Sequence, residues 1–360
     1  MSEGEGTDRN PGPCGCRTGS DQTAGSGGQG TENPLIIETS SVLDRKAKRD
    51  HVLARLGQDR NGHRVVPGLY SLGSPDPTSP VVVTANYTLS FDAVRTALAG
   101  MDAFILVLDT KGINVWCAAG KGTFGTSELI NRITRTALAT VVRHRRLVLP
   151  ELGAPGVSAH DVHKETGFHV EYGPVRAGDL PLFLKERVAT PEMRTVRFPV
   201  RDRIVLIPVE LRSALVPAII GAVVLWLAGG WLPPAALIAA VVAGTVLFPV
   251  LLPYLPTVDF STKGFILGFI VAIPFAYASY LPGITVVPAW VSIASMISLL
   301  LVIPSLTAYL ALNFTGSTPF TSRTGVRKEI YSYVPVMTGA GLIGISFALV
   351  VGLTHFLGVW

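Results

Sequence analysis

Formal charge almost disappears from the second half of the chain, and this constrains the fold more than any other feature. Between residues 214 and 360 only six residues carry a charge, and none lies in 214–258 or 264–322. The apolar residues form five spans, each close to the ~20 residues that cross a bilayer. These spans are roughly 214–232, 235–253, 264–282, 286–310 and 333–357. Because backbone groups in lipid must be hydrogen-bonded internally, we predict that all five are helices.

The basic residues orient these spans. After Arg203, every Lys and Arg lies before the first span, in the 254–263 segment or in the 311–332 segment. With five spans these regions share one side of the membrane, and their positive charge predicts that this side is cytoplasmic. We therefore expect a multi-pass protein of the cytoplasmic (inner) membrane, in contact with lipid, whose preceding domain faces the cytoplasm.

The net charge of +5 and the isoelectric point near 9.2 raise the question of nucleic-acid binding. Much of the excess lies in arginines just before the first span, namely Arg194, Arg197, Arg201, Arg203 and Arg212. Basic residues at that place are explained by their position on the cytoplasmic side of a span. No nucleic-acid partner is therefore expected.

The first 34 residues are rich in Gly, Ser, Thr and Asp and are predicted to be a disordered tail. They lack the apolar stretch of a cleavable signal peptide, so we expect none. Cys14 and Cys16 in this tail are either a redox or metal-handling pair or two incidental thiols. The chain has three cysteines, too few for a disulfide framework or a four-thiolate cluster within it.

The region that follows is typical of a water-facing α/β domain. The first 213 residues contain 26 of the 30 Lys and Arg, because only four lie beyond them. Short apolar runs predict strands, and helical spacing predicts a helix from the N-cap Ser90 to Leu98 and another over about 126–143. The predicted strands are 80–84, 103–108, 113–116 and 147–149. This alternation predicts a Rossmann-like α/β domain with a largely parallel sheet over 35–203. An all-α domain of five transmembrane helices over 204–360 follows it.

Cys117 is the one cysteine between residues 35 and 360 and stands in the segment Asn114–Lys121. A phosphate-binding P-loop is excluded, because Val115 replaces the required first glycine and Gly122 replaces the Ser or Thr after Lys121. A cysteine hydrolase would need a histidine beside the thiol, and nothing in the sequence places one there. From the residues alone, a buried and inert cysteine remains the leading alternative.

The segment Asn-Val-Trp-Cys-Ala-Ala-Gly-Lys at 114–121 resembles the cap-helix signature of the mercury-methylation corrinoid protein family, HgcA. Three other segments are similar to the large subunit of the corrinoid iron–sulfur protein: Val83–Asp92, Leu152–Val157 and Tyr172–Arg176. In the apolar half, Asn313–Ser322 resembles a further shared segment. Matches run from about residue 65 to 330.

The resemblance implies a base-off, cobalamin-type corrinoid, with Cys117 as the catalytic residue and the lower axial ligand of cobalt. A thiolate is a soft, strongly donating ligand, and ligand identity tunes a cofactor's electronics. Cofactor binding is expected from Asn114, Val115, Trp116, Cys117, Ala118, Ala119, Gly120 and Lys121. Weaker candidates follow predicted strands or begin helices, where ligands gather in α/β folds. They are Thr84, Thr126, Ala154, Pro155 and Gly156. Lys121 could lower the pKa of the thiol or meet a corrinoid side chain, and a solvated charge explains it equally. Pro155 and Gly156 are equally explained as turn residues. His160 and His163 could contact the tail or the upper face of the cofactor, and are equally explained as surface histidines.

The activity implied is methyl transfer from a methyl-Co(III) corrinoid to Hg(II), forming methylmercury. Turnover would require a methyl-donor system and a reductant. The chain lacks cluster cysteines, and the resemblance implies a small ferredoxin-like [4Fe-4S] electron donor of the HgcB type. Two alternatives stay open. One is a corrinoid methyl carrier of one-carbon metabolism, and the other is a non-catalytic membrane sensor or transporter.

Overall fold

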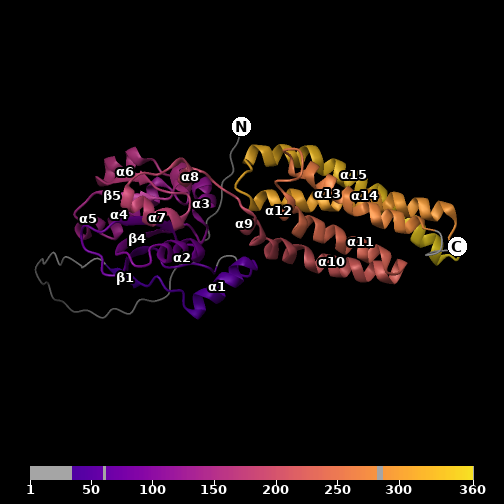
Figure 1. Cartoon of the computed structure of the whole chain (residues 1–360), viewed down its shortest axis with the longest axis horizontal. Coiled ribbons are helices and arrows are strands. Elements are labelled where there is room, and N and C mark those ends of the chain that lie inside the picture. The colour runs from indigo at the N-terminus through magenta and orange to yellow at the C-terminus, as the bar shows by residue number, and fades with distance from the viewer. Residues whose placement is uncertain (1–34, 60–61, 282–286, 360) are drawn as a thin grey trace, which may run out of the picture. The chain divides into compact units, whose positions relative to one another are not determined.

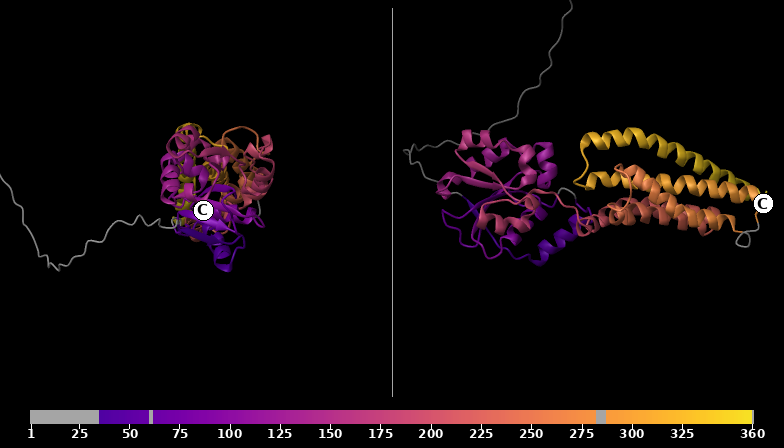
Figure 2. Two further views of the ribbon diagram at one scale, coloured as in Figure 1. Left: turned by 90° about the vertical axis from the view of Figure 1, so that its left-hand side faces the viewer. Right: turned by 45° about the horizontal axis from the view of Figure 1, so that its top comes forward.

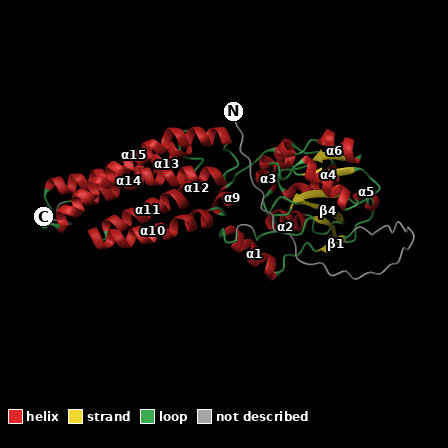
Figure 3. Ribbon diagram, turned by 180° about the vertical axis from the view of Figure 1, so that it is seen from behind, coloured by secondary structure: helices red, strands yellow, loops and turns green. Residues whose placement is uncertain are grey.

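The computed structural model describes residues 35–59, 62–281 and 287–359 (Figure 1). The predicted disordered tail and the predictions for Cys14 and Cys16 lie outside these residues. Residues 35–360 form one compact unit. Within the described residues, all strands lie between Ile36 and Tyr172, in what we call the α/β part. The described residues from Val200 onward contain helices and no strands, and we call them the helical part (Figure 3).

A six-stranded sheet organises the α/β part, in the order β1-β2-β4-β3-β5-β6. The strands are β1 (Ile36–Thr39), β2 (Gly68–Leu72), β3 (Val81–Ala85), β4 (Ala103–Leu108), β5 (Arg146–Leu149) and β6 (His169–Tyr172). All neighbours are parallel except β2 and β4, which are antiparallel. The predicted α/β fold with a largely parallel sheet is therefore confirmed, and β1, β2 and β6 add to the strands predicted.

Helices cover both faces of this sheet (Figures 1 and 2). They are α2 (Thr88–Ala97), α3 (Val115–Lys121), α4 (Thr126–Arg135), α5 (Leu138–Val141), η1 (Glu151–Gly156), α6 (Ala159–Thr166), η2 (Ala177–Asp179), α7 (Leu180–Glu186) and α8 (Pro191–Arg194). Helix α1 (Arg45–Arg55) buries none of its residues. Every residue of β3 and β4 is buried, and alternate side chains enter two cores. One core contains Phe124 and Leu129, and the other contains Phe91 and Phe183. Burial on both faces explains why β4 is apolar throughout and why β3 is apolar except for Thr84.

Three local predictions are wrong. The helix expected to start at Ser90 begins at Thr88, because the amides of Ser90 and Phe91 both donate to the Tyr87 carbonyl. The helix expected over 126–143 ends at Arg135, since Ala137 takes a left-handed φ of 45° before α5. The strand expected at 113–116 is instead a loop and the first turn of α3. Asn114 caps that helix and turns the chain out of the extended conformation.

A buried histidine ties α1 to the loop that follows it. The His63 ring lies with Nδ1 2.7 Å from Asp50 Oδ1 and Nε2 2.6 Å from the Gln58 carbonyl oxygen. Both partners are acceptors, so both ring nitrogens must carry protons to satisfy them. Burial lowers the pKa of His63, but the Gln58 carbonyl and the Asp50 carboxylate outweigh this and raise it above its ordinary value. The fold therefore favours the imidazolium form.

The helical part consists of long helices with short irregular turns. They are α9 (Val200–Ile204), α10 (Ile207–Gly229), α11 (Leu232–Val242), the π-helix η3 (Ala243–Leu247), α12 (Phe248–Leu251), α13 (Phe260–Tyr280), α14 (Ala289–Asn313), the 3-10 turn η4 (Phe314–Ser317) and α15 (Arg323–Phe356). Five stretches within the described residues are long and apolar enough to cross a membrane, which confirms the number predicted. The first and last begin earlier than expected, at Val200 and Thr324.

Helices α13 and α14 pack backbone to backbone. A Cβ on Gly268 would lie 2.5 Å from Pro304 Cα, and one on Gly264 would lie 2.5 Å from Ala308 Cα. Small residues at four-residue spacing allow such close approach between membrane helices. The three middle spans are 39–50% buried, whereas the first and last are 6% and 11% buried. Helices α11, α13 and α14 therefore form the interior of the helical part.

Candidate functional site around Cys117

The segment that carries Cys117 is a seven-residue helix with a defined start and end. Asn114 has extended backbone angles, and its Oδ1 accepts a hydrogen bond from the Cys117 amide at 2.9 Å. At the other end Gly122 takes a left-handed φ of 80°, the conformation that commonly closes a helix. Asn114 and Gly122 thus fix where α3 begins and ends in the segment between β4 and α4.

Helix α3 turns one side to the core and leaves the thiol accessible. Val115, Ala118 and Ala119 are buried in the core beside the sheet. Trp116 is 38% exposed, and Cys117 is a partly exposed free cysteine. The alternative of a fully buried, inert cysteine does not fit this exposure. The thiol is available to a ligand.

Cys117 lines a cavity of about 430 Å³, which we call the Cys117 cavity. The carboxyl ends of β3, β5 and β6 converge on it through Thr84, Pro150 and Pro174. In open α/β sheets, ligands bind beyond the carboxyl ends of the strands. Most of the other lining side chains are apolar, including Val82, Val83, Val115, Leu152 and Val175. The cavity therefore suits a largely apolar ligand that is held by one soft side chain.

The cavity gathers only part of the predicted site. Thr84, Asn114, Val115, Trp116 and Cys117 line it. Thr84 is 1% exposed, so it forms part of the buried wall. The remaining predicted residues do not line the cavity, and their contact with a cofactor stays a prediction.

Four of these remaining residues lie in or beside the turn that packs against α3: Thr126, Ala154, Pro155 and Gly156. A Cβ on Gly156 would lie 2.1 Å from the Phe124 carbonyl oxygen and 3.0 Å from Ala119 Cα, so the turn Ala154-Pro155-Gly156 packs against the helix. Thr126 Oγ1 accepts a hydrogen bond from the Ser158 amide at 2.9 Å, just beyond this turn.

Of the other remaining residues, Ala118 and Ala119 are buried in the core, and the rest are on the surface. Gly120 and Lys121 are exposed at the end of α3. His160 is exposed on α6, and His163 stacks on His169 with ring centroids 4.0 Å apart.

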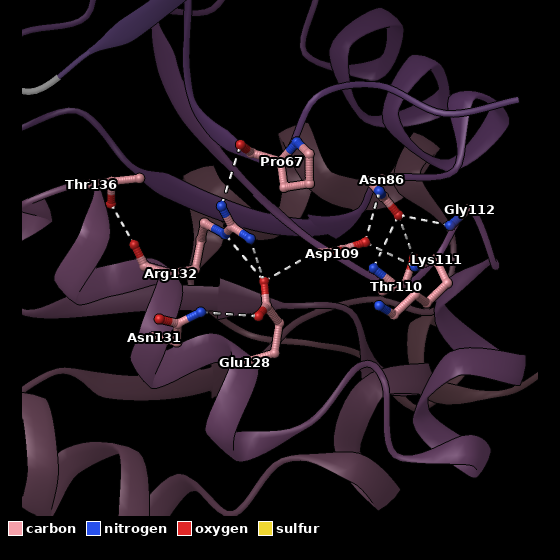
Figure 4. Close-up of polar contacts among 10 residues, drawn as sticks. All are labelled: Pro67, Asn86, Asp109, Thr110, Lys111, Gly112, Glu128, Asn131, Arg132 and Thr136. Atoms are coloured by element: carbon pink, nitrogen blue, oxygen red, sulfur yellow. Dashed lines mark hydrogen bonds and ion pairs between the residues drawn. The ribbon is translucent and has the colours of Figure 1, made fainter. Parts of the chain in front are cut away.

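A buried amide that sequence reasoning gave no role holds the loop before α3 (Figure 4). Asn86 directly follows β3 and is 2% exposed. Its Oδ1 accepts hydrogen bonds from the Thr110 and Gly112 amides, both at 3.0 Å, and lies 2.9 Å from the Thr110 hydroxyl. Its Nδ2 donates to Asp109 Oδ1 at 3.2 Å. An amide side chain directly after the largely apolar strand β3 was the signal that could have found it.

The same loop is held from its other side by α4. Glu128 Oε1 accepts the Asp109 amide at 2.9 Å and forms an ion pair with Arg132 at 2.7 Å. Arg132 also donates to the Pro67 carbonyl at 3.3 Å. The loop between β4 and α3 is therefore fixed from two neighbouring elements, and with it the position of Asn114.

Near the cavity, Tyr172 is kept neutral. Burial, and then the nearby Glu151 charge, raise the pKa of its hydroxyl above the ordinary value. The hydroxyl donates to the Val157 carbonyl at 2.6 Å, which anchors the chain directly after η1. Tyr172 thus contributes a fixed hydrogen bond rather than a titrating group.

Comparison with known proteins agrees with this placement. Residues 57–184 match the family described as CO dehydrogenase/acetyl-CoA synthase delta subunit. The match covers β2 to β6, α3 and the strand ends that form the Cys117 cavity.

The chain is also similar to individual relatives. The acetyl-CoA decarbonylase/synthase complex subunit gamma of Methanopyrus kandleri is 37% identical over 129 residues, which are 35% of this chain and 28% of the relative. Its counterpart in Archaeoglobus fulgidus is 34% identical over 125 residues, covering 34% and 26%. The corrinoid/iron-sulfur protein large subunit of Moorella thermoacetica is 26% identical over 167 residues, covering 44% and 37%. The chain thus spans about a quarter to a third of these relatives, and the resemblance to corrinoid proteins is supported for its α/β part.

Proposed function

We propose that the Cys117 cavity binds a corrinoid, base-off, with Cys117 Sγ as the lower ligand of cobalt. The observation that carries this is one partly exposed thiol on a cavity wall at the carboxyl ends of parallel strands. The similarity of the chain to the corrinoid/iron-sulfur protein large subunit of Moorella thermoacetica supports it.

The donor set fits such a cofactor. Among the residues that the structure describes, no three His, Cys, Asp or Glu side chains lie close enough to hold a bare metal ion. A metal delivered inside a macrocycle needs one protein ligand, and a thiolate is a soft, strongly donating one. The apolar walls beside Cys117 suit the flat face of a corrin ring, since ligand sites are mostly apolar with a few placed polar groups.

Cys117 and the residues that position α3 would have different roles in holding the corrinoid. Cys117 would hold the cobalt through its thiolate, a soft and strongly donating ligand whose identity tunes the cofactor's electronics. Asn114 holds the start of α3, while Asn86 and Glu128 hold the loop before it. When bound, the corrinoid supplies a methyl group that can leave with its bonding electron pair.

We further propose that the methyl acceptor is Hg(II). The corrinoid would supply the methyl group together with both electrons of its bond, and Hg(II) would accept that pair to give methylmercury. The resemblance of residues 114–121 to the mercury-methylation corrinoid proteins supports this choice. Reduction and remethylation would need a ferredoxin-like [4Fe-4S] electron donor of the HgcB type and a methyl-donor system. The five long apolar helices would anchor the chain in the cytoplasmic membrane, with the 35–203 domain facing the cytoplasm.

Cobalt ligation is tested with the full chain in detergent, reconstituted with hydroxocobalamin. We expect retained cobalamin whose visible spectrum and Co(II) electron paramagnetic resonance signal change in Cys117→Ala. The double variant Cys14→Ala/Cys16→Ala should keep the wild-type spectra, because those cysteines lie outside residues 114–121, the segment proposed to hold the cobalt. Unchanged spectra in Cys117→Ala would exclude the ligand role.

The acceptor is tested separately. Cells that produce Cys117→Ala at the wild-type protein level should lose mercury methylation. The second candidate function is a methyl carrier that serves a partner protein, which is favoured by relatives named as subunits of a complex. Purified methylated protein that forms methylmercury from Hg(II) without a partner protein would decide for the transferase. Transfer only to a partner protein would decide for the carrier.

A further inference from the structure

The helical part of the chain supplies one wall of the Cys117 cavity. Leu206, Gly316, Ser317 and Pro319 all line it, together with Cys117 and Trp116. Leu206 directly precedes α10, and the other three lie in or just after η4. Residues of the α/β part and residues about 200 positions later along the chain therefore share one cavity.

The segment 314–319, which we call the η4 turn, is held firmly in place. Ser317 Oγ donates to Glu210 Oε1 at 2.6 Å, which ties the turn to α10. The Thr321 hydroxyl donates to the Thr315 carbonyl at 2.7 Å. Thr318 is fully buried, and its hydroxyl accepts the Phe320 amide at 3.2 Å. The turn is therefore a structured wall.

Residues 195–206 connect α8 to α10, and we call them the linker. The linker packs against the same η4 turn. The Phe198 ring lies 6.4 Å from that of Phe314 and 5.8 Å from that of Phe320, measured between centroids. Such distances are typical of packed aromatic pairs. Farther along, the buried Arg203 donates to the carbonyls of Pro249 and Val250 at 2.8 and 2.7 Å. The linker thus joins the η4 turn and the α12 region to the α/β part.

We infer that the η4 turn is part of the cofactor site, so that the α/β domain by itself does not form the whole of it. As to the ligand, this inference rests on the proposed corrinoid. The corrin ring carries amide side chains around its edge. The turn offers them a hydroxyl oxygen on Ser317, whose proton is already committed to Glu210. It also offers Gly316, where the backbone can be approached closely.

Gly316 makes the inference testable without disturbing the fold. A Cβ built at this position meets no atom within 4 Å, so a side chain added there enters open space. In the full chain carrying Cys14→Ser and Cys16→Ser, Gly316→Cys leaves two thiols, its own and that of Cys117. A short bis-maleimide should join them within one chain, as read by mass spectrometry. Lys328→Cys, exposed on α15 and outside the cavity lining, is the matched control and should give little cross-link.

A second experiment tests whether the cofactor lies beside the η4 turn. Hydroxocobalamin bound before the reagent should abolish the cross-link, and Gly316→Trp should lose most cobalamin retention while Lys328→Trp keeps it. The inference is overturned if both thiols are labelled singly but never joined. It is also overturned if wild-type chain retains cobalamin through Cys117 and neither protection nor the Gly316→Trp loss is seen. Wild-type chain that retains no cobalamin refutes the proposed function instead, and a positive cross-link then still places the turn at the cavity.

Discussion

Replacement of Asn86 by alanine tests whether one buried amide holds the loop before Cys117. The change removes the acceptor of two backbone amides, those of Thr110 and Gly112. Thr110 is fully buried and Gly112 is buried, so water cannot replace the lost acceptor. The Thr110 hydroxyl keeps a partner, because it lies 2.6 Å from the Ile113 carbonyl oxygen. The main energetic cost of Asn86→Ala is therefore the loss of a hydrogen-bond acceptor for the buried amides of Thr110 and Gly112.

Each buried donor left without a partner costs about 1–3 kcal/mol. Asn86→Ala should thus lower the free energy of unfolding by about 2–6 kcal/mol, a large part of the roughly 5–15 kcal/mol that holds a domain folded. Asn86→Asp keeps an acceptor but places a second carboxylate beside Asp109, which accepts from Asn86 at 3.2 Å in the native chain. Its loss of stability should be smaller than that of the alanine variant.

The assay is pulse proteolysis of the full chain in detergent over a series of urea concentrations, followed through cleavage of the α/β part. Asn131→Ala is the matched control. Asn131 is exposed and makes one long hydrogen bond, at 3.4 Å, to Glu128 of the same network. Its loss should stay within about 0.5 kcal/mol. Equal urea midpoints for Asn86→Ala and Asn131→Ala would refute the role of Asn86.

Three further outcomes follow from the structure. Asn114→Ala should cost about 1 kcal/mol, because it removes the cap of α3, while Asn114→Ser should retain most of it; urea midpoints compare the two. The pKa of His63 is raised in the fold, so its contribution to stability is full below the unfolded value of about 6.5 and is lost as pH rises through the folded value. The difference in urea midpoint between wild type and His63→Gln should therefore shrink as the pH is raised through this range, and a pH-independent difference would contradict the assignment. Gly268→Ala should destabilise the chain by about 1–3 kcal/mol, since its Cβ meets the α14 backbone, whereas Gly339→Ala meets nothing within 4 Å. Thermal unfolding in detergent measures both, and equal losses would count against the close packing.

Prediction succeeded where the signal was local. Strands β3, β4 and β5 are short apolar runs, and each was expected within a residue of its true start. Strands β1, β2 and β6 were missed because polar residues or glycine interrupt their short apolar runs, and parts of them are exposed or half-buried. Their extended conformation depends on neighbours in the sheet rather than on their own pattern.

The run at 113–116 shows how a local preference is overridden. Ile, Val and Trp favour a strand, yet Asn114 caps a helix there and Val115 packs into the core on α3. The cap satisfies the Cys117 amide, and the loop before it is fixed by Asn86 and Glu128. The geometry of the Cys117 segment therefore depends on residues that its own pattern does not contain.

The amino-acid sequence by itself determined the five long apolar helices and singled out Cys117. Partition into a bilayer depends on the length and polarity of one continuous segment, which can be read directly. Only the tertiary structure decided that Thr84, Cys117 and Gly316 line the same cavity, and that one Asn86 oxygen meets amides 24 and 26 residues away. Such meetings depend on strand order and on how distant helices pack, and the periodicity of a single segment carries no information about either.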